Sequence, residues 1–106
     1  MGKGIIMYSF GDVVLAEVQY VDSSETKKRP ALVLFEEYNN VVLAGITSNP
    51  EMKGISITKE EGMLQDSIIK LNYIFTMDSR SIVKTLFSVS AKKKQEIREA
   101  FVSKLK

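Results

Sequence analysis

Three consecutive basic residues stand directly before a proline and an apolar run, in the stretch TKKRPALVLF over residues 26–35. A residue that precedes proline is pushed into extended geometry, so Arg29 has a more restricted backbone than an ordinary loop residue. A planar guanidinium on such a backbone suits bidentate binding of a phosphate. The same residues also describe a solvated loop arginine beside a strand-starting proline, because charged runs are common on protein surfaces.

Two more places carry side chains that could act with this arginine. Thr47 and Ser48 end an apolar run, where hydroxyl groups can donate to a phosphate oxygen or form a turn with their own backbone. Asp78 and Arg80 follow another apolar run, where an acid beside a base is either a proton-transfer pair or an ordinary turn. Each signal taken alone also has a purely structural explanation.

The polar segment DSSETKK over residues 22–28 predicts a loop and supplies the remaining candidates. Glu25 lies where an acid could approach a substrate, although a solvated acid fits the same position. Lys28 adjoins the arginine, where its charge could draw a polyanion inward.

The composition limits the chemistry. The 106 residues include no cysteine and no histidine, which removes thiolate metal sites, the commonest metal ligand and the commonest general base. Any chemistry must then come from Arg, Lys, Asp, Glu, Ser, Thr or Tyr side chains, and we expect no cofactor. The net charge of +2 gives only weak support for nucleic-acid binding. No apolar run approaches the roughly 20 residues that span a bilayer, and no signal-peptide pattern is present, so we expect a cytoplasmic protein without a membrane partner.

The length and the hydropathy pattern predict one domain, residues 1–106, built from short strands and one helix. Apolar runs between turn clusters predict strands at residues 10–20, 30–35, 41–47, 54–58, 67–71 and 73–78. From Ser90, an acceptable N-cap, the pattern changes to a helix whose apolar face carries Ile97, Ala100, Phe101 and Leu105. The expected fold is mainly β (α+β), a small β-barrel with a C-terminal amphipathic helix packed on it.

Taken in order, these motifs resemble the MazF/PemK family of bacterial and archaeal toxins. The resemblance rests on GDVVL over residues 11–15, KRPALVL over 28–34 and GITS over 45–48, and it continues through SIIK over 67–70 and FTMD over 75–78. The glycine-aspartate start followed by the arginine-proline motif is its most specific part. In all it covers residues 9–105.

This resemblance implies an SH3-like barrel, as in MazF and CcdB toxins, that forms a homodimer and is held in check by a cognate antitoxin protein. It also implies sequence-specific, metal-independent cleavage of single-stranded RNA, the activity of an mRNA interferase. The family's essential arginine matches Arg29, its strand-end hydroxyl matches Thr47, and the catalytic aspartate of the PemK-like branch matches Asp78. We therefore predict these three as catalytic, and as substrate-binding residues Glu25, Lys28, Ser48 and Arg80.

The expected reaction suits a chain without histidine, because RNA supplies its own nucleophile, the 2′-hydroxyl. The protein then needs only to bind the phosphate, orient it and assist proton transfer. In this interpretation Arg29 stabilises charge on the phosphorane, Thr47 donates a hydrogen bond to the phosphate and Asp78 is the general base. The products would be a 2′,3′-cyclic phosphate and a 5′-hydroxyl.

Two alternatives stay open. The first is a binding module of the same fold that does not cleave RNA, as in related toxins that trap a DNA topoisomerase. Arg29 and Thr47 favour the nuclease, because a pure protein-binding role has no need of a phosphate clamp. The second is an inactive family member, since Thr76 stands where the PemK-like branch has an arginine, and Phe87 matches a glycine that the family often has ahead of its final helix.

Overall fold

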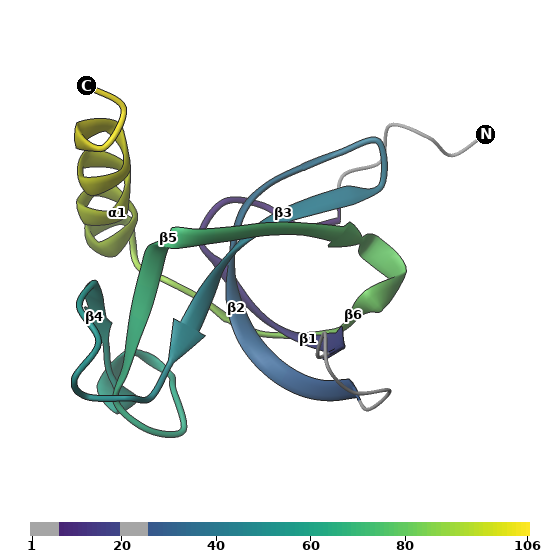
Figure 1. The fold of residues 1–106 in the computed structure, drawn as a ribbon, viewed down its shortest axis with the longest axis horizontal. Helices are drawn as coiled ribbons and strands as arrows, with labels where there is room; N and C mark the ends of the chain where they lie inside the picture. Colours follow the sequence, from purple (N-terminus) through teal and green to yellow (C-terminus); the bar gives the residue numbers. More distant parts are fainter. Residues whose placement is uncertain (1–6, 20–25) are drawn as a thin grey trace.

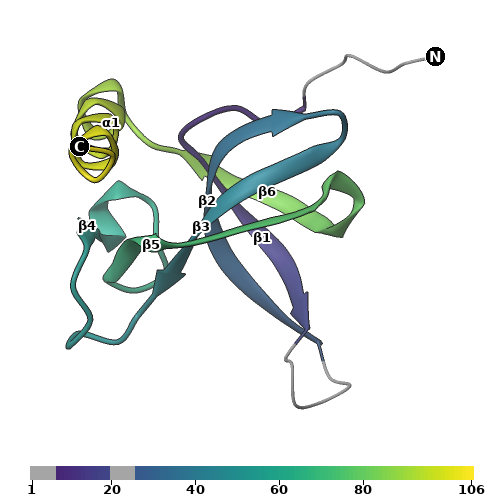
Figure 2. The same ribbon diagram turned by 45° about the horizontal axis from the view of Figure 1, so that its top comes forward.

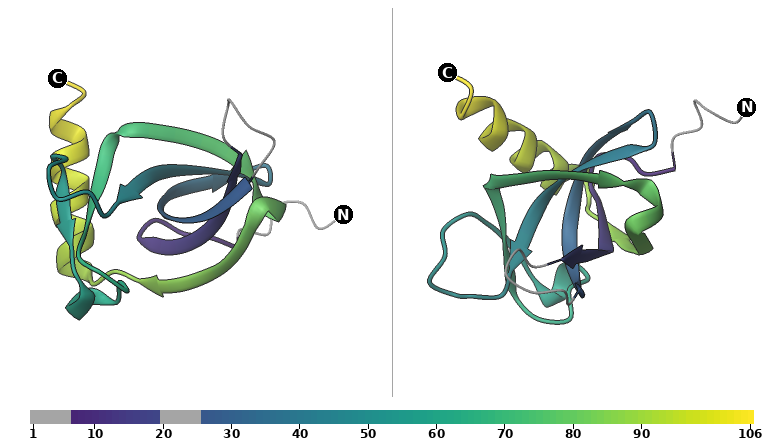
Figure 3. Two further views of the ribbon diagram at one scale, coloured as in Figure 1. Left: turned by 60° about the horizontal axis from the view of Figure 1, so that its bottom comes forward. Right: turned by 45° about the vertical axis from the view of Figure 1, so that its right-hand side comes forward.

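The computed structural model describes residues 7–19 and 26–106, which form one curled antiparallel sheet and one C-terminal helix (Figure 1). The six strands lie in the order β4-β5-β3-β2-β1-β6, and the sheet curls into a half-barrel (Figure 3). Their bounds are β1 Asp12–Gln19, β2 Thr26–Glu37, β3 Asn40–Thr47, β4 Ile55–Ile57, β5 Ser67–Asp78 and β6 Ile82–Ser88. Two short 3-10 helices, η1 Lys59–Glu61 and η2 Ser79–Ser81, precede β5 and β6, and helix α1 spans Ala91–Ser103. The predicted fold class is confirmed.

Both faces of the sheet are buried, because successive side chains of a strand point to opposite faces. Val13 and Leu32 belong to a core cluster that includes Ile97 of α1. Their neighbours Val14 and Val33 belong to a second cluster on the other face. The two clusters together hold the central strands β1, β2 and β3 in a fixed register.

Helix α1 lies beside β4 and the first part of β5 (Figure 2). As predicted, Ser90 caps it, because the Ser90 hydroxyl oxygen accepts a hydrogen bond from the backbone N–H of Lys93 at 3.1 Å. The ammonium of Lys93 donates to the carbonyl of Ser56 at 2.8 Å and forms an ion pair with Glu61 at 3.2 Å. The basic start of the helix thus attaches it to β4 and η1.

Three strand predictions were wrong in detail. Strand β2 begins at Thr26, so the end of the expected loop is already paired with β1. Residues 67–78 form one continuous strand, although two strands were predicted there. The polar Asn72 interrupted the apolar pattern because it lies exposed in the middle of β5. Strand β6 was not predicted at all: it is an edge strand whose side chains are mostly exposed, so its sequence lacks a long apolar run.

The predicted strand over residues 30–35 would begin at Pro30, but the strand observed begins four residues earlier. Pro30 lies inside β2, opposite Leu15 of β1, with β3 on the other side of the strand. The ladder between β2 and β3 begins one residue later, with Ala31 opposite Gly45. Pro30 therefore lies beyond the end of that ladder, where a missing N–H is tolerated.

Replacing Ile97 tests whether the helix belongs to the core. Ile97 is fully buried, so Ile97→Ala should lower the free energy of unfolding by about 2–5 kcal/mol. Val102 lies half-exposed on the same helix, and Val102→Ala is a matched control that should cost about 1 kcal/mol or less. Urea unfolding measures both. Equal losses for the two variants would contradict a core role for this face of α1.

Candidate functional site

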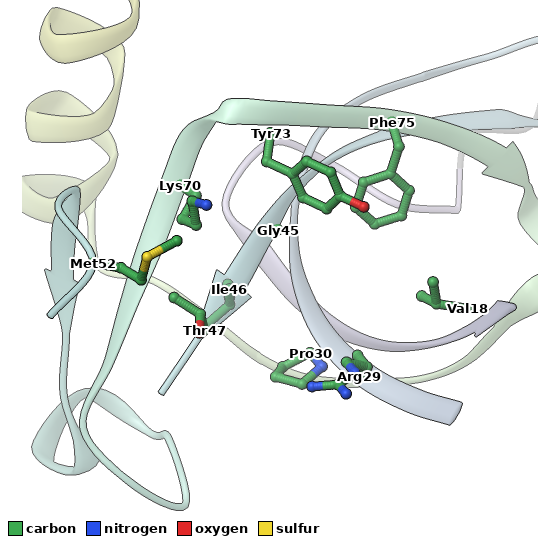
Figure 4. A pocket seen from close by; sticks show the side chains of 10 residues that line it. All are labelled: Val18, Arg29, Pro30, Gly45, Ile46, Thr47, Met52, Lys70, Tyr73 and Phe75. Atoms are coloured by element: carbon green, nitrogen blue, oxygen red, sulfur yellow. The ribbon is translucent and has the colours of Figure 1, made fainter. Parts of the chain in front are cut away.

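The register of β2 and β3 brings Arg29 and Thr47 together. The last pair of the β2–β3 ladder is Ala31 with Gly45, and Arg29 and Thr47 each lie two residues beyond it, on neighbouring strands. Both side chains line a cavity of about 250 Å³, the clamp cavity (Figure 4). Its other lining residues are Val18, Pro30, Gly45, Ile46, Met52, Lys70, Tyr73 and Phe75.

Strand pairing fixes the backbone of Arg29 more firmly than the sequence suggested. The residue before proline is restricted in any chain, but Arg29 also lies inside β2 and pairs with Ala16 of β1. Its side chain is exposed at the cavity wall, where the guanidinium can reach an anion. A rigid backbone with an accessible planar cation is the arrangement that bidentate phosphate binding needs.

Thr47 forms the turn that its sequence allowed, and it keeps a hydrogen to donate. Its hydroxyl oxygen accepts a hydrogen bond from the backbone N–H of Asn49 at 3.2 Å. The side chain of Asn49 in turn accepts from the N–H of Glu51 at 3.0 Å, so the chain folds back directly after β3. A hydroxyl that accepts through its oxygen can still donate its own hydrogen. The turn therefore orients the Thr47 hydroxyl without using up its donor.

Lys28 and Ser48 line a second hollow, of about 490 Å³, together with Lys84, Leu86 and other residues. Side chains alternate along a strand, so Lys28 and Arg29 point to opposite faces of β2. Arg29 and Thr47 also line this second hollow, and they therefore form the boundary between the two sites. The predicted substrate-binding residues Lys28 and Ser48 thus adjoin the predicted catalytic residues Arg29 and Thr47, but they line the second hollow and not the clamp cavity.

Asp78 and Arg80 lie away from both hollows. Strands β3 and β5 are antiparallel, so Asp78 at the end of β5 pairs with Asn40 at the start of β3. At about 3.3 Å per residue, the length of β3 separates Asp78 from Thr47 by roughly 20 Å. A single chain therefore does not bring Asp78 or Arg80 to the cavity that Arg29 and Thr47 line. Glu25, the remaining predicted site residue, lies outside the described residues.

Asp78 and Arg80 instead form an exposed local pair at η2. The guanidinium of Arg80 donates to both carboxylate oxygens of Asp78 at 3.0 Å, and the Arg80 N–H donates at 2.8 Å. These hydrogen bonds lower the pKa of Asp78 from its ordinary value of 3.8 to about 2. At neutral pH the carboxylate is charged, and it is a weak proton acceptor.

Sequence reasoning missed the aromatic wall of the clamp cavity. Tyr73 and Phe75 have ring centroids 5.8 Å apart with their planes at 45°, and the Lys70 ammonium lies 5.9 Å from the centroid of the Tyr73 ring. The alternation of Tyr73 and Phe75 indicates one shared face. No sequence signal placed that face beside Thr47, because the pairing of β5 with β3 shifts between Ala44 and Gly45.

Within residues 7–19 and 26–106, no group of three or more Asp or Glu side chains is arranged to hold a metal ion. None of the helices in that part of the chain is long and apolar enough to cross a membrane.

Comparison with known proteins identifies the family. Residues 9–105 match the family model of the PemK-like, MazF-like toxin of type II toxin-antitoxin system. The chain belongs to this family. A comparison with curated proteins found no match.

Solved structures of toxins share the fold of this family member. A MazE-MazF structure from Deinococcus radiodurans has a TM-score of 0.75 at 19% identity, covering 95% of this chain and 97% of that chain. Mycobacterium tuberculosis toxin MazF-mt6 has a TM-score of 0.68 at 21% identity, with coverages of 85% and 93%. An endoribonuclease in complex with its cognate antitoxin from Mycobacterial species has a TM-score of 0.71 at 14% identity, with coverages of 92% and 94%.

The Asp78–Arg80 pair should make stability depend on pH in acid. The pKa of Asp78 is lower in the folded protein, so its contribution is present above about pH 4 and is lost as the pH falls towards 2. Asp78→Asn should therefore unfold slightly more easily than wild type at neutral pH, with a difference that disappears near pH 2. Urea unfolding across this range measures the difference, and Arg80→Ala should reduce the pH dependence in the same way. A wild-type advantage that persists unchanged near pH 2 would contradict this assignment.

Proposed function

We propose that this MazF-like toxin is an endoribonuclease that cleaves single-stranded RNA at a phosphate held between Arg29 and Thr47. The observation that carries the proposal is that a guanidinium and a strand-end hydroxyl line one cavity from neighbouring strands. Family membership supports it, and one protein of similar fold is described as an endoribonuclease. A binding module without activity would have no use for this pair of hydrogen-bond donors to a phosphate.

In the proposed reaction the 2′-oxygen attacks the adjacent phosphorus in line with the 5′-oxygen. The P–O2′ bond forms as the P–O5′ bond breaks, the 2′-hydroxyl loses its proton and the leaving 5′-oxygen gains one. Arg29 binds the non-bridging oxygens, where charge is greatest in the transition state, and Thr47 donates a hydrogen bond to one of them. No metal is needed to generate a nucleophile, because the RNA carries it. The products are a 2′,3′-cyclic phosphate and a 5′-hydroxyl.

We assign the two proton transfers to water rather than to Asp78. The pKa of about 2 makes that carboxylate a poor base, also where the second copy of a homodimer would bring it to the phosphate. Thr76, which stands where the PemK-like branch has an arginine, is likewise at the far end of β5, opposite Val42. Its identity therefore does not weaken the clamp formed by Arg29 and Thr47.

The second hollow extends the site along a substrate strand. Lys28 and Lys84 line it, and it shares Arg29 and Thr47 with the clamp cavity. A single-stranded RNA that passes Arg29 and Thr47 from one hollow to the other would meet positive charge on both sides of its bound phosphate. Such a charged track supports affinity for RNA without reading its sequence.

We also propose that the chain forms a homodimer and binds a cognate antitoxin in the cytoplasm. One of the similar structures is described as an endoribonuclease in complex with its cognate antitoxin, and another as MazE-MazF. In this chain Leu64, Val83 and Leu86 are large apolar side chains left exposed, the last two on the edge strand β6. Apolar side chains gathered at an unpaired edge are a surface that a protein partner can cover.

Replacing Arg29 tests the clamp. Wild-type protein should cut a long single-stranded RNA in EDTA into discrete fragments that end in a cyclic phosphate. Arg29→Ala removes a preorganised donor and should slow this cleavage by about 10²- to 10³-fold, as measured by single-turnover kinetics. Arg98 on α1 lies over the ring of Phe10, away from the cavity, so Arg98→Ala is a matched control expected to cleave normally. Full activity in a folded Arg29→Ala protein would remove Arg29 from the mechanism.

A further inference from the structure

Tyr73 is an exposed aromatic side chain inside the long strand β5. It is 57% exposed, and its ring faces the clamp cavity across from Arg29 (Figure 4). Burial in the core therefore does not explain why the chain places a large ring here. A half-exposed aromatic surface beside a nucleic-acid site is typical of a platform for base stacking.

The neighbours of Tyr73 hold its ring in place. Phe75 packs against it at a tilt of 45°, and Gly45 of the adjoining strand leaves room for it. A Cβ atom at Gly45 would come within 2.7 Å of Cδ2 of Tyr73, so only glycine at that position lets the ring lie this close to β3. The ring is thus held between Phe75 and the backbone of Gly45, while much of its surface stays accessible. A preorganised ring loses little conformational freedom when a ligand stacks on it.

Lys70 adds positive charge to the same wall. It pairs with Gly45 across the β3–β5 ladder, so its side chain lies on the cavity face, with the ammonium 5.9 Å from the centroid of the Tyr73 ring. An aromatic face beside a cation matches a nucleotide, which carries a flat base and a negative phosphate. The remaining walls include the apolar side chains of Val18 and Met52, which favour contact by shape rather than by hydrogen bonds.

From these contacts we propose that Tyr73 stacks on one RNA base, the base next to the phosphate held by Arg29 and Thr47. This inference rests on the proposed function and deepens it, because it assigns a base-binding subsite to the reaction. The cavity of about 250 Å³ is smaller than the 300–1,000 Å³ typical of sites for drug-sized ligands, so it suits a single flat base. Tyr73 is then a substrate-binding residue that selects for the presence and size of that base.

The test combines a ring deletion with a base deletion. Its substrates are an RNA oligonucleotide with one cleavage site and two derivatives with an abasic nucleotide on the 5′ or the 3′ side of the scissile phosphate. Wild-type kcat/KM should fall by roughly 5- to 100-fold on one of the two abasic substrates, the range expected for one stacked base. Tyr73→Ala should lose a similar factor on intact RNA and nothing further on that abasic substrate. Tyr73→Phe, which keeps the ring, should behave as wild type.

An exposed tyrosine elsewhere gives the control. Tyr38 lies at the β2–β3 turn, is 89% exposed and has a positive φ of 53°, a conformation that asparagine tolerates well. Tyr38→Asn should leave kcat/KM and the response to both abasic substrates unchanged. If wild type tolerates both abasic substitutions, or if Tyr73→Ala remains as sensitive to them as wild type, the stacking assignment is overturned.

Binding separates this inference from the nuclease itself. The same three oligonucleotides can carry a 2′-deoxy sugar at the cleavage position, which blocks the reaction and leaves the base in place. Wild type should bind the intact analogue more tightly than one of the two abasic analogues, the one that lacks the stacked base. Tyr73→Ala should bind that abasic analogue and the intact analogue equally. That result without any cleavage of RNA would overturn the proposed activity and support the base subsite. Equal binding of all three analogues by wild type would overturn the subsite, whatever the activity.

Discussion

The antiparallel register of β2 and β3 is the constraint on which the site depends. Arg29 and Thr47 each lie two residues beyond its last pair, Ala31 with Gly45, and a slip of one residue would turn one of the two to the other face of the sheet. The core prevents such a slip, because Leu32 and Ala44 pack in the cluster that contains the helix, while Val33 and Leu43 pack in the other. Burial on both faces of the sheet therefore positions two polar side chains that lie outside the core.

The end of the β2–β3 ladder explains why the site lies where it does. Pro30 donates no hydrogen bond, the ladder begins at Ala31, and the chain leaves β3 through the turn at Thr47. Beyond this point the two strands are no longer paired, so an anion can approach Arg29 and Thr47 from the open end. The hollows on the two faces meet here, so the proposed RNA substrate would have a continuous path past Arg29 and Thr47.

The sequence pointed to two residues, Arg29 and Thr47, that line one cavity, and it carried too little information for the surroundings of that cavity. Arg29 and Thr47 stand next to apolar runs, and such local patterns survive folding. The remoteness of Asp78 could not be foreseen, because it follows from the antiparallel pairing of β5 with the start of β3. Tyr73 was missed for a related reason: a register shift beside Gly45 brings it to the cavity, and a single sequence does not show such an irregularity.

The central claim is that Arg29 and Thr47 act on one phosphate, and a double-mutant cycle on RNA cleavage tests it most directly. Single-turnover rates would be measured for wild type, Arg29→Ala, Thr47→Val and the double variant, with Thr47→Ser as the conservative control. Two donors that share one phosphate should be coupled, so the double variant should lose clearly less than the product of the two single losses, while Thr47→Ser stays close to wild type. Losses that multiply fully, or a Thr47→Val protein as fast as wild type, would contradict a shared phosphate clamp.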